Sequence, residues 1–167
     1  MSTDAPTLQT PRTSLRAYRE SDRQPFVELN TDAEVRRHMD GPLTQLEADA
    51  LFDRFVSGAA PDAWAVVDKD TGTYLGHAFL GSEPDVSGIA IGFLILRRHW
   101  GRGLATEVAS ALVSFAFAQR DAGAVGATVD AYNPASIRVL EKIGLGRAAE
   151  REDENGRYYI YGLERQR

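Results

Sequence analysis

A stretch near the middle of the chain constrains the fold more than any other. Its apolar run, Ile89–Leu96, is long enough for a buried strand, and it ends in basic residues followed by Gly101-Arg102-Gly103. Four apolar residues then recur at the spacing that places them on one face of a helix: Leu104, Val108, Leu112 and Phe115. The sequence thus predicts a strand, a glycine loop and a helix. Such a loop leaves backbone N–H groups free at the positive end of a helix, where they can hold phosphate oxygens.

The length and composition predict one globular domain. The chain has 167 residues, of which 43% are hydrophobic and 26% charged, as is ordinary for a domain with a substantial core. We expect the polar, proline-containing residues 1–12 to form a flexible lead-in and residues 13–167 to form the domain. The chain shows no run of eighteen apolar residues and no charged-then-apolar N-terminus, so we expect neither a membrane span nor a signal peptide.

The charge and the lack of cysteine exclude several functions. Without cysteine the chain has no disulfide, no thiolate metal site and no cysteine nucleophile, which fits a cytoplasmic location. The histidines His38, His77 and His99 lack metal-ligand spacing, so we predict no metal. A net charge of −5 argues against a nucleic-acid partner and is compatible with cationic partners such as amines.

The rest of the pattern predicts a mixed sheet with helices on its faces, an α/β domain of the α+β type. Three helices are predicted in the first third of the chain. The first starts at Ser21 or Asp22, the second covers Ala33–Met39, and the third follows the capping box of Thr44 and Glu47. Seven segments have strand patterns: Thr13–Tyr18, Ala63–Asp68, Tyr74–Leu80, Ile89–Leu96, Ala124–Val129, Leu145–Ala149 and Arg157–Leu163. The change from helical to strand periodicity therefore falls near residue 63.

Two motifs indicate the function. The glycine loop can be aligned in two frames, Arg98-His-Trp-Gly101-Arg-Gly103 or Trp100-Gly-Arg-Gly103-Leu-Ala105, and Asn133-Pro-Ala-Ser136 begins a later helix. With the order of elements, these motifs resemble the GNAT superfamily, the acetyl-CoA-dependent N-acetyltransferases, over nearly the whole chain. The family's pyrophosphate motif is Gln or Arg, two residues, Gly, one residue, then Gly or Ala. We prefer the second frame, which has the expected distance from the strand. Within the family, the chain is most similar to the branch that acts on ribosomal-protein N-termini.

The resemblance implies a mixed, mostly antiparallel sheet of about seven strands and acetyl-CoA as the cosubstrate. In the family, the loop holds the pyrophosphate, and backbone N–H groups of the central strand, here Phe93–Ile95, polarise the thioester carbonyl. Asn133 would contact the pantetheine arm, and Ser136 would lie near the thioester sulfur. The implied donor contacts are Phe93, Leu94, Ile95, Arg98, Gly101, Arg102, Gly103, Leu104, Ala105, Thr106, Asn133 and Ser136.

Several of these residues have plainer interpretations. Gly101 and Gly103 could serve a tight turn alone, and Asn133 before a proline is a common helix start that needs no ligand. The arginines could be solvated charges, although we expect at least one of Arg97, Arg98 and Arg102 to contact phosphates of the donor. A single glycine loop would be weak evidence for donor binding. The two motifs together, separated in the sequence as they are in the family, favour it more strongly.

The general base is the weakest part of the prediction. Relatives carry Glu or Tyr at positions that here hold Ala90, Thr128 and Leu140, none of which can accept a proton from an amine. The remaining candidates lie near the strand that enters the site and could act through water: Glu83, Asp85 and His77. Each of them could instead be structural or a surface residue.

The sequence therefore predicts an N-acetyltransferase that moves an acetyl group from acetyl-CoA to a primary amine by direct attack in a ternary complex. The favoured acceptor is a protein or peptide N-terminal α-amine, because an α-amine is neutral far more often at pH 7 than a lysine side chain. The alternatives are acetylation of a small amine, such as an antibiotic or polyamine, and a non-catalytic CoA-binding regulatory module. The resemblance also suggests a possible homodimer.

Overall fold

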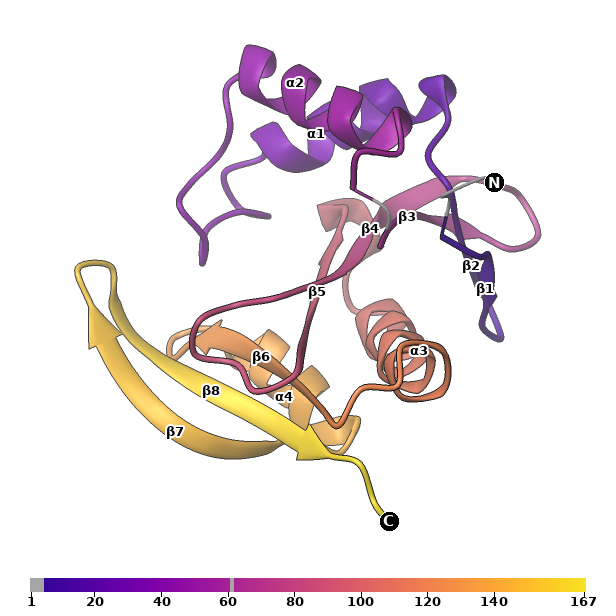
Figure 1. Ribbon diagram of the computed structural model, residues 1–167. Helices are drawn as coiled ribbons and strands as arrows, with labels where there is room; N and C mark the ends of the chain where they lie inside the picture. Colours follow the sequence, from indigo (N-terminus) through magenta and orange to yellow (C-terminus); the bar gives the residue numbers. More distant parts are fainter. Residues whose placement is uncertain (1–4, 61) are drawn as a thin grey trace.

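The computed structural model describes residues 5–60 and 62–167, and the strands in these ranges form one sheet (Figure 1). The strands are β1 (Leu8–Gln9), β2 (Thr13–Arg16), β3 (Ala63–Asp68), β4 (Tyr74–Gly81), β5 (Ile89–Ile95), β6 (Ala124–Asp130), β7 (Gly146–Asp153) and β8 (Gly156–Glu164). Their order across the sheet is β1-β2-β3-β4-β5-β6-β8-β7. The β5–β6 pair is parallel and the other described pairs are antiparallel. The predicted α/β class with a mixed, mostly antiparallel sheet is confirmed.

Helices cover both faces of the sheet. The longer ones are α1 (Arg23–Thr31), α2 (Gln45–Val56), α3 (Leu104–Gln119) and α4 (Pro134–Lys142), and two short 3-10 helices are η1 (Glu20–Asp22) and η2 (Arg97–His99). On one face, Phe26 of α1 and Phe52 of α2 pack in a cluster with Tyr74 of β4. On the other face, α3 and α4 pack in a larger core with the central strands. Figure 1 shows α1 and α2 together, apart from α3 and α4.

The larger core explains why the central segments take their observed form. Leu104, Val108 and Leu112, spaced for one helix face, are all fully or almost fully buried. Trp64 of β3 is fully buried, and its ring meets that of Phe115 edge-on with 5.4 Å between centroids. Burial of these side chains is the main favourable term for docking α3 on the sheet, at about 1.5–3 kcal/mol for each large aliphatic side chain. Trp64 therefore belongs to the same core as α3.

The segment between α1 and α2 differs from the prediction. Residues 33–40 form consecutive turns, whereas the sequence pattern predicted a helix over Ala33–Met39. The guanidinium of Arg36 is buried and donates to the carbonyl of Gly41 over 2.7 Å and to the side chain of Asn30 over 3.1 Å. A seven-residue segment is too short to offset helix nucleation on its own, so these side-chain bonds determine its conformation.

The N-terminal segment also differs from the expected flexible lead-in. Residues 1–4 lie outside the described residues, but Leu8–Gln9 pairs with β2, and Ala5 is buried. The indole N–H of Trp64 donates to the carbonyl of Pro6 over 2.9 Å. Because a buried indole N–H needs an acceptor, the segment is held by the core it covers. It adds an eighth strand to the seven predicted.

The loops that frame the site follow the sequence closely. Thr44 and Glu47 form the predicted capping box at the start of α2, and the turn at Asp153–Gly156 joins β7 to β8. The β7–β8 hairpin forms a curved arm at one side of the sheet (Figure 1). No helix within the described ranges is long and apolar enough to cross a membrane.

Candidate active site

The sheet opens along a seam between its two parallel strands. β5 and β6 are paired only at Ile89–Val125 and Ala90–Gly126, and beyond these residues the described strands have no common register. The backbone N–H and C=O groups of β5 that face this seam beyond Ala90 therefore lack a strand partner. Polar backbone groups in a sheet interior need partners, so the seam suits an extended ligand with amide groups of its own.

The glycine loop lies at the end of β5 and begins α3. Gly101 and Gly103 both have φ of +75°, in the left-handed region that favours glycine, and Gly103 is the N-cap of α3. Leu104, Ala105 and Thr106 form the first turn, whose N–H groups have no acceptor within the helix. The indole N–H of Trp100 donates to the carbonyl of Ile95 over 2.8 Å and so ties the loop to the strand. Free N–H groups at the start of a helix can bind an anion, and here they lie at the end of the seam.

The arginines near the loop have different surroundings. Arg97 pairs with Asp32 over 3.2 Å, and Arg98 pairs with Glu28, so both side chains are directed to α1. Arg102 is exposed, lies beside His99 and lines the cavity described below. Of the three arginines, Arg102 is thus the one placed to contact a phosphate, and Arg98 is not among the cavity-lining residues of the described chain.

The second motif lies across the seam from the loop. The Asn133 side chain accepts from the backbone N–H of Ser136 over 3.2 Å and donates to the hydroxyl of Ser136 over 3.0 Å. Asn133 is therefore the N-cap of α4, as its plainer interpretation required, and both side chains also line the cavity. Capping and ligand contact are compatible because the amide is only partly buried.

One cavity of about 1190 Å³ joins the seam, the glycine loop and the start of α4. Most residues predicted to bind the donor line it, and so do two of the base candidates: Phe93, Leu94, Ile95, Gly101, Arg102, Gly103, Leu104, Ala105, Thr106, Asn133, Ser136, Glu83 and Asp85. The predicted Arg98 and His77 do not belong to its described lining. The structure thus brings into one cavity two motifs that lie about thirty residues apart in the sequence, from Gly103 to Asn133.

The three positions where the family resemblance implies a base, Ala90, Thr128 and Leu140, carry no group that can accept a proton from an amine. Ala90 and Leu140 are buried, and the hydroxyl of Thr128 donates to Oε2 of Glu83 over 2.8 Å. Asp85 accepts a hydrogen bond from the hydroxyl of Tyr158 over 2.8 Å, and this bond raises the pKa of Tyr158. Two carboxylates of the β4–β5 loop are therefore held over the seam by residues of β6 and β8.

His77, the third base candidate, lies elsewhere. It is buried among aromatic rings on the α1–α2 face, with its ring centroid 4.8 Å from that of Phe55, and Tyr18 shares a hydrogen bond with its Nδ1 over 2.7 Å. Burial lowers the pKa of His77 to about 3. A neutral ring in a packed cluster outside the cavity cannot reach an amine there, so the structure does not support His77 as a base.

The comparisons with known proteins decide the family. The family model for an acetyltransferase (GNAT) domain matches residues 12–146. The chain belongs to the GNAT family of acetyltransferases. This GNAT protein is 33% identical to the uncharacterised protein YkkB of Bacillus subtilis over 144 residues, which cover 83% of this chain and 84% of YkkB. The N-acetyltransferase activity of the family is thereby assigned to the chain, whereas its acceptor is not.

Solved structures share the fold. A GNAT-family acetyltransferase from Bacillus anthracis superposes with a TM-score of 0.85 at 20% identity, covering 95% of this chain and 98% of the other. Spermidine N-acetyltransferase from Vibrio cholerae, solved with CoA and spermine, superposes with a TM-score of 0.78 at 16% identity, covering 91% and 95%. At such identities the likeness concerns the fold alone.

Two features of this GNAT site were not predicted. His38, from the turns between α1 and α2, has its Nδ1 3.0 Å from Oδ2 of Asp130 at the end of β6, and both residues line the cavity. Arg12 donates to Glu107 in the first turn of α3, and its Nη2 would lie 3.5 Å from a Cβ atom at Gly103. Both pairs join segments that are distant in the sequence, so no local pattern predicts them. The one signal that the sequence offers is Asp130 at the carboxyl end of a strand.

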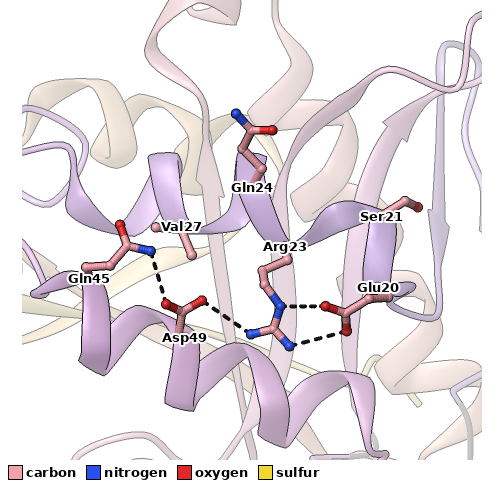
Figure 2. A pocket seen from close by; sticks show the side chains of 7 residues that line it. All are labelled: Glu20, Ser21, Arg23, Gln24, Val27, Gln45 and Asp49. Carbon is pink, nitrogen blue, oxygen red and sulfur yellow. Dashed lines mark hydrogen bonds and ion pairs between the residues drawn. The ribbon is translucent and has the colours of Figure 1, made fainter.

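A second cavity of this GNAT domain, of about 460 Å³, lies between η1, α1 and α2 (Figure 2). Figure 2 shows Arg23 between two carboxylates, and its guanidinium pairs with Glu20 over 2.6 Å and with Asp49 over 3.3 Å. Gln45 donates in turn to Asp49. The charged groups there pair with one another, and neither motif contributes to the lining, so we assign the active site to the larger cavity.

Within the described residues, no group of three or more histidine, aspartate or glutamate side chains is arranged to hold a metal ion.

Proposed function

We propose that this protein transfers the acetyl group of acetyl-CoA to a primary amine by direct attack in a ternary complex, and that the amine is the N-terminal α-amine of a protein or peptide. The observation that best supports acetyl-CoA as the donor is the open seam between β5 and β6, which leads to the left-handed glycine loop. The cavity that joins them, about 1190 Å³, is large enough for both substrates.

The residues of the cavity fit acetyl-CoA. The N–H groups of the loop and of the first turn of α3 would hold the pyrophosphate, with the exposed guanidinium of Arg102 beside them. The free edge of β5 would bind the amides of the pantetheine arm, and the Asn133 amide lies across the seam. When bound, the donor supplies a thioester, whose carbonyl is activated towards amines.

The protein groups needed for the transfer are few. Backbone N–H groups in the region Phe93–Ile95 would donate to the carbonyl oxygen as negative charge develops on it, which is commonly the largest electrostatic contribution to acyl transfer. The hydroxyl of Ser136 would face the sulfur and can donate to the departing thiolate. Since the chain has no cysteine, we infer a direct transfer, and ping-pong kinetics or an isolated acyl-enzyme would contradict it.

The favoured acceptor follows from proton affinity. A lysine side chain has a reference pKa of about 10.4 and an α-amine about 7.7–8.0, so at pH 7 the α-amine is neutral roughly several hundred times more often. Such an acceptor demands less of the group that removes its proton, and Ala90, Thr128 and Leu140 cannot serve as that group.

A second candidate acceptor, a small polycationic amine, is supported by the wall of the cavity. Six carboxylates line it: Glu34, Asp40, Glu83, Asp85, Asp130 and Asp153. Carboxylates in a partly enclosed site attract and orient cations. We propose that Glu83 and Asp85, the two base candidates that remain in the cavity, bind the ammonium group of the acceptor, whichever class it belongs to.

An acceptor screen tests the proposal. Thiol release from acetyl-CoA would be measured with N-terminal peptides, with the same peptides blocked at the α-amine but carrying lysine, with spermidine and with aminoglycosides. The proposal predicts the highest kcat/KM for peptides with a free α-amine. A preference for spermidine would favour the second candidate, and a lysine rate equal to the α-amine rate at pH 7 would contradict the pKa argument. Binding of CoA without turnover of any acceptor would contradict catalysis altogether.

A further inference from the structure

A histidine–carboxylate pair stands on the wall of the cavity, although no base stands at the positions where relatives carry one. Nδ1 of His38 lies 3.0 Å from Oδ2 of Asp130, and their side chains are 26% and 29% exposed. These exposures are high enough for a ligand to reach the ring and low enough for its orientation to be held. Both residues line the same cavity as the glycine loop and Asn133.

Asp130 is held in place from two sides. It is the last residue of β6, and its Oδ1 accepts from the backbone N–H of Tyr132 over 2.8 Å while Oδ2 faces His38. Its carbonyl accepts from the backbone N–H of Asn133 over 3.0 Å, so the carboxylate is rigidly related to the start of α4. A carboxylate fixed in this way determines where the His38 ring can lie.

The pair faces the proposed acceptor. Thr128 lies two residues before Asp130 on the same strand, so both side chains point to the same face of the sheet. That face is the one on which Thr128 holds Glu83 over the seam. His38 approaches it from the turns between α1 and α2, so the ring and the Glu83 carboxylate flank one region of the cavity.

We propose that His38 is the general base that removes a proton from the acceptor ammonium, and that Asp130 is its positioning residue. This inference rests on the proposed amine acetylation. A carboxylate that accepts from Nδ1–H leaves the lone pair of Nε2 available, which is the tautomer a base requires. Imidazoles have a reference pKa of about 6.5, nearer to that of an α-amine than a carboxylic acid has, and such matching favours proton transfer near neutral pH.

Charged groups of both signs line the cavity around the pair. From the turns that carry His38 the cavity receives Glu34, Arg37 and Asp40; from the end of β6 it receives Asp130, and from the β4–β5 loop it receives Glu83. The β7–β8 hairpin adds Asp153, Arg157 and Tyr158, and the β4–β5 loop adds Asp85. The glycine loop and α4 add Arg102, Arg138 and Lys142, so six carboxylates and five arginine or lysine side chains line the cavity.

The proton balance of the reaction is closed. The ammonium N–H bond breaks, and its proton passes to Nε2 of His38, directly or through one water. The neutral nitrogen then forms a C–N bond to the thioester carbon as the C–S bond breaks, and the second proton of the nitrogen passes to the thiolate. His38 returns its proton to solvent, so each turnover yields one amide, one thiol and one free proton.

The test compares His38→Gln, Asp130→Asn and Glu83→Gln over the pH range 5.5–9, with Asp121→Asn as a surface-carboxylate control. We expect His38→Gln to lower kcat/KM for the acceptor by roughly 10²-fold or more. We also expect it to flatten the acidic limb of the wild-type pH profile, while the KM for acetyl-CoA stays within about twofold. Asp130→Asn should lower kcat less than His38→Gln does and should leave the acidic limb of the pH profile visible. Added imidazole should partly restore the activity of a His38→Ala enzyme.

Two outcomes would overturn the assignment. One is a full-size acidic limb in His38→Gln, which would mean that any rate loss is structural. The other is loss of that limb in Glu83→Gln alone, which would assign the base to Glu83.

A measurement on the free protein separates this inference from the proposed function. With three histidines in the chain, ¹⁵N imidazole spectra of the wild type and of His38→Gln identify the His38 signal. The inference requires the Nδ1–H tautomer in the neutral wild type and a mixed tautomer in Asp130→Asn. A neutral Nε2–H tautomer in the wild type would refute the base, whether or not the enzyme turns over. Absence of thiol release from the wild type, with the Nδ1–H tautomer present, would instead refute the proposed function.

Discussion

The hydroxyl of Thr128 donates a hydrogen bond to Oε2 of Glu83 over 2.8 Å and so joins residues 45 positions apart in the sequence. Thr128 lies on β6 beside the seam and carries no charge of its own. In this chain the carboxylate comes instead from the β4–β5 loop and is held by the threonine. The bond therefore supplies negative charge to the acceptor side of the cavity from a neighbouring segment.

We expect Glu83→Gln to raise the KM for the amine acceptor about tenfold while the KM for acetyl-CoA stays unchanged. The glutamine keeps the shape of the side chain but loses a charged hydrogen bond to an ammonium, which is worth about 1.5–3 kcal/mol. Thr128→Val should have a smaller effect, because the carboxylate remains but is less well oriented. Steady-state kinetics with each substrate varied in turn would measure both. An increase confined to the KM for acetyl-CoA would assign Glu83 to the donor side.

Substitution of two arginines beside the glycine loop should have different effects on the KM for acetyl-CoA. Arg102→Ala is expected to raise the KM for acetyl-CoA about five- to tenfold, since its exposed guanidinium lines the cavity. Arg98→Ala removes the same charge four positions earlier in the sequence. Because the Arg98 side chain pairs with Glu28 of α1, the KM for acetyl-CoA should stay within about twofold. Titration of each variant with CoA by calorimetry would check the binding itself. Equal weakening by both variants would show that the loop responds to net charge rather than to position.

Glycine at position 101 should be required by backbone conformation rather than by space. Its φ is +75°, and a Cβ atom built there meets nothing within 4 Å. Gly101→Ala should therefore destabilise the fold by about 1–2 kcal/mol and raise the KM for acetyl-CoA as the loop shifts. Gly123→Ala is the matched control, because its Cβ also meets nothing and its φ is not positive. Urea denaturation and donor kinetics of the two variants give the comparison, and equal stabilities would contradict the argument.

Acid should destabilise the protein through His77. Burial lowers the pKa of His77 to about 3 in the folded chain, whereas an unfolded histidine titrates near 6.5. The unfolded state therefore binds the extra proton first, so the stability is complete above pH 6.5 and falls as the pH drops towards 3. The slope approaches ~1.4 kcal/mol per pH unit.

The variant His77→Gln isolates that contribution, because glutamine can still accept from the Tyr18 hydroxyl. The difference in unfolding free energy between wild type and variant, measured in urea at pH 7, 6 and 5, should shrink by about 1 kcal/mol or more over this range. A difference that is constant with pH would mean that His77 is protonated in the folded state or reached by solvent.

Local patterns were enough to predict most of the fold and the conformation of the two motifs. The strand, glycine loop and helix around Gly103, the N-cap at Asn133 and the capping box at Thr44 each depend on residues a few positions apart. Their geometry follows from backbone conformation and side-chain period, which a short segment largely determines. The helix predicted over Ala33–Met39 was wrong because the conformation of this segment depends on residues outside it: Arg36 donates to Asn30 and Gly41.

The sequence by itself determined the class of fold, the order of most of its elements and the conformation of the glycine loop, because these depend on hydrophobic period, glycine conformation and helix capping. Only the tertiary structure decided which charged side chains meet in the cavity. It directed Arg98 to α1 and buried His77 under an aromatic cluster, and it brought His38 to Asp130 across 92 residues. Such pairings depend on how distant segments pack, and a pattern of neighbouring residues does not contain that information.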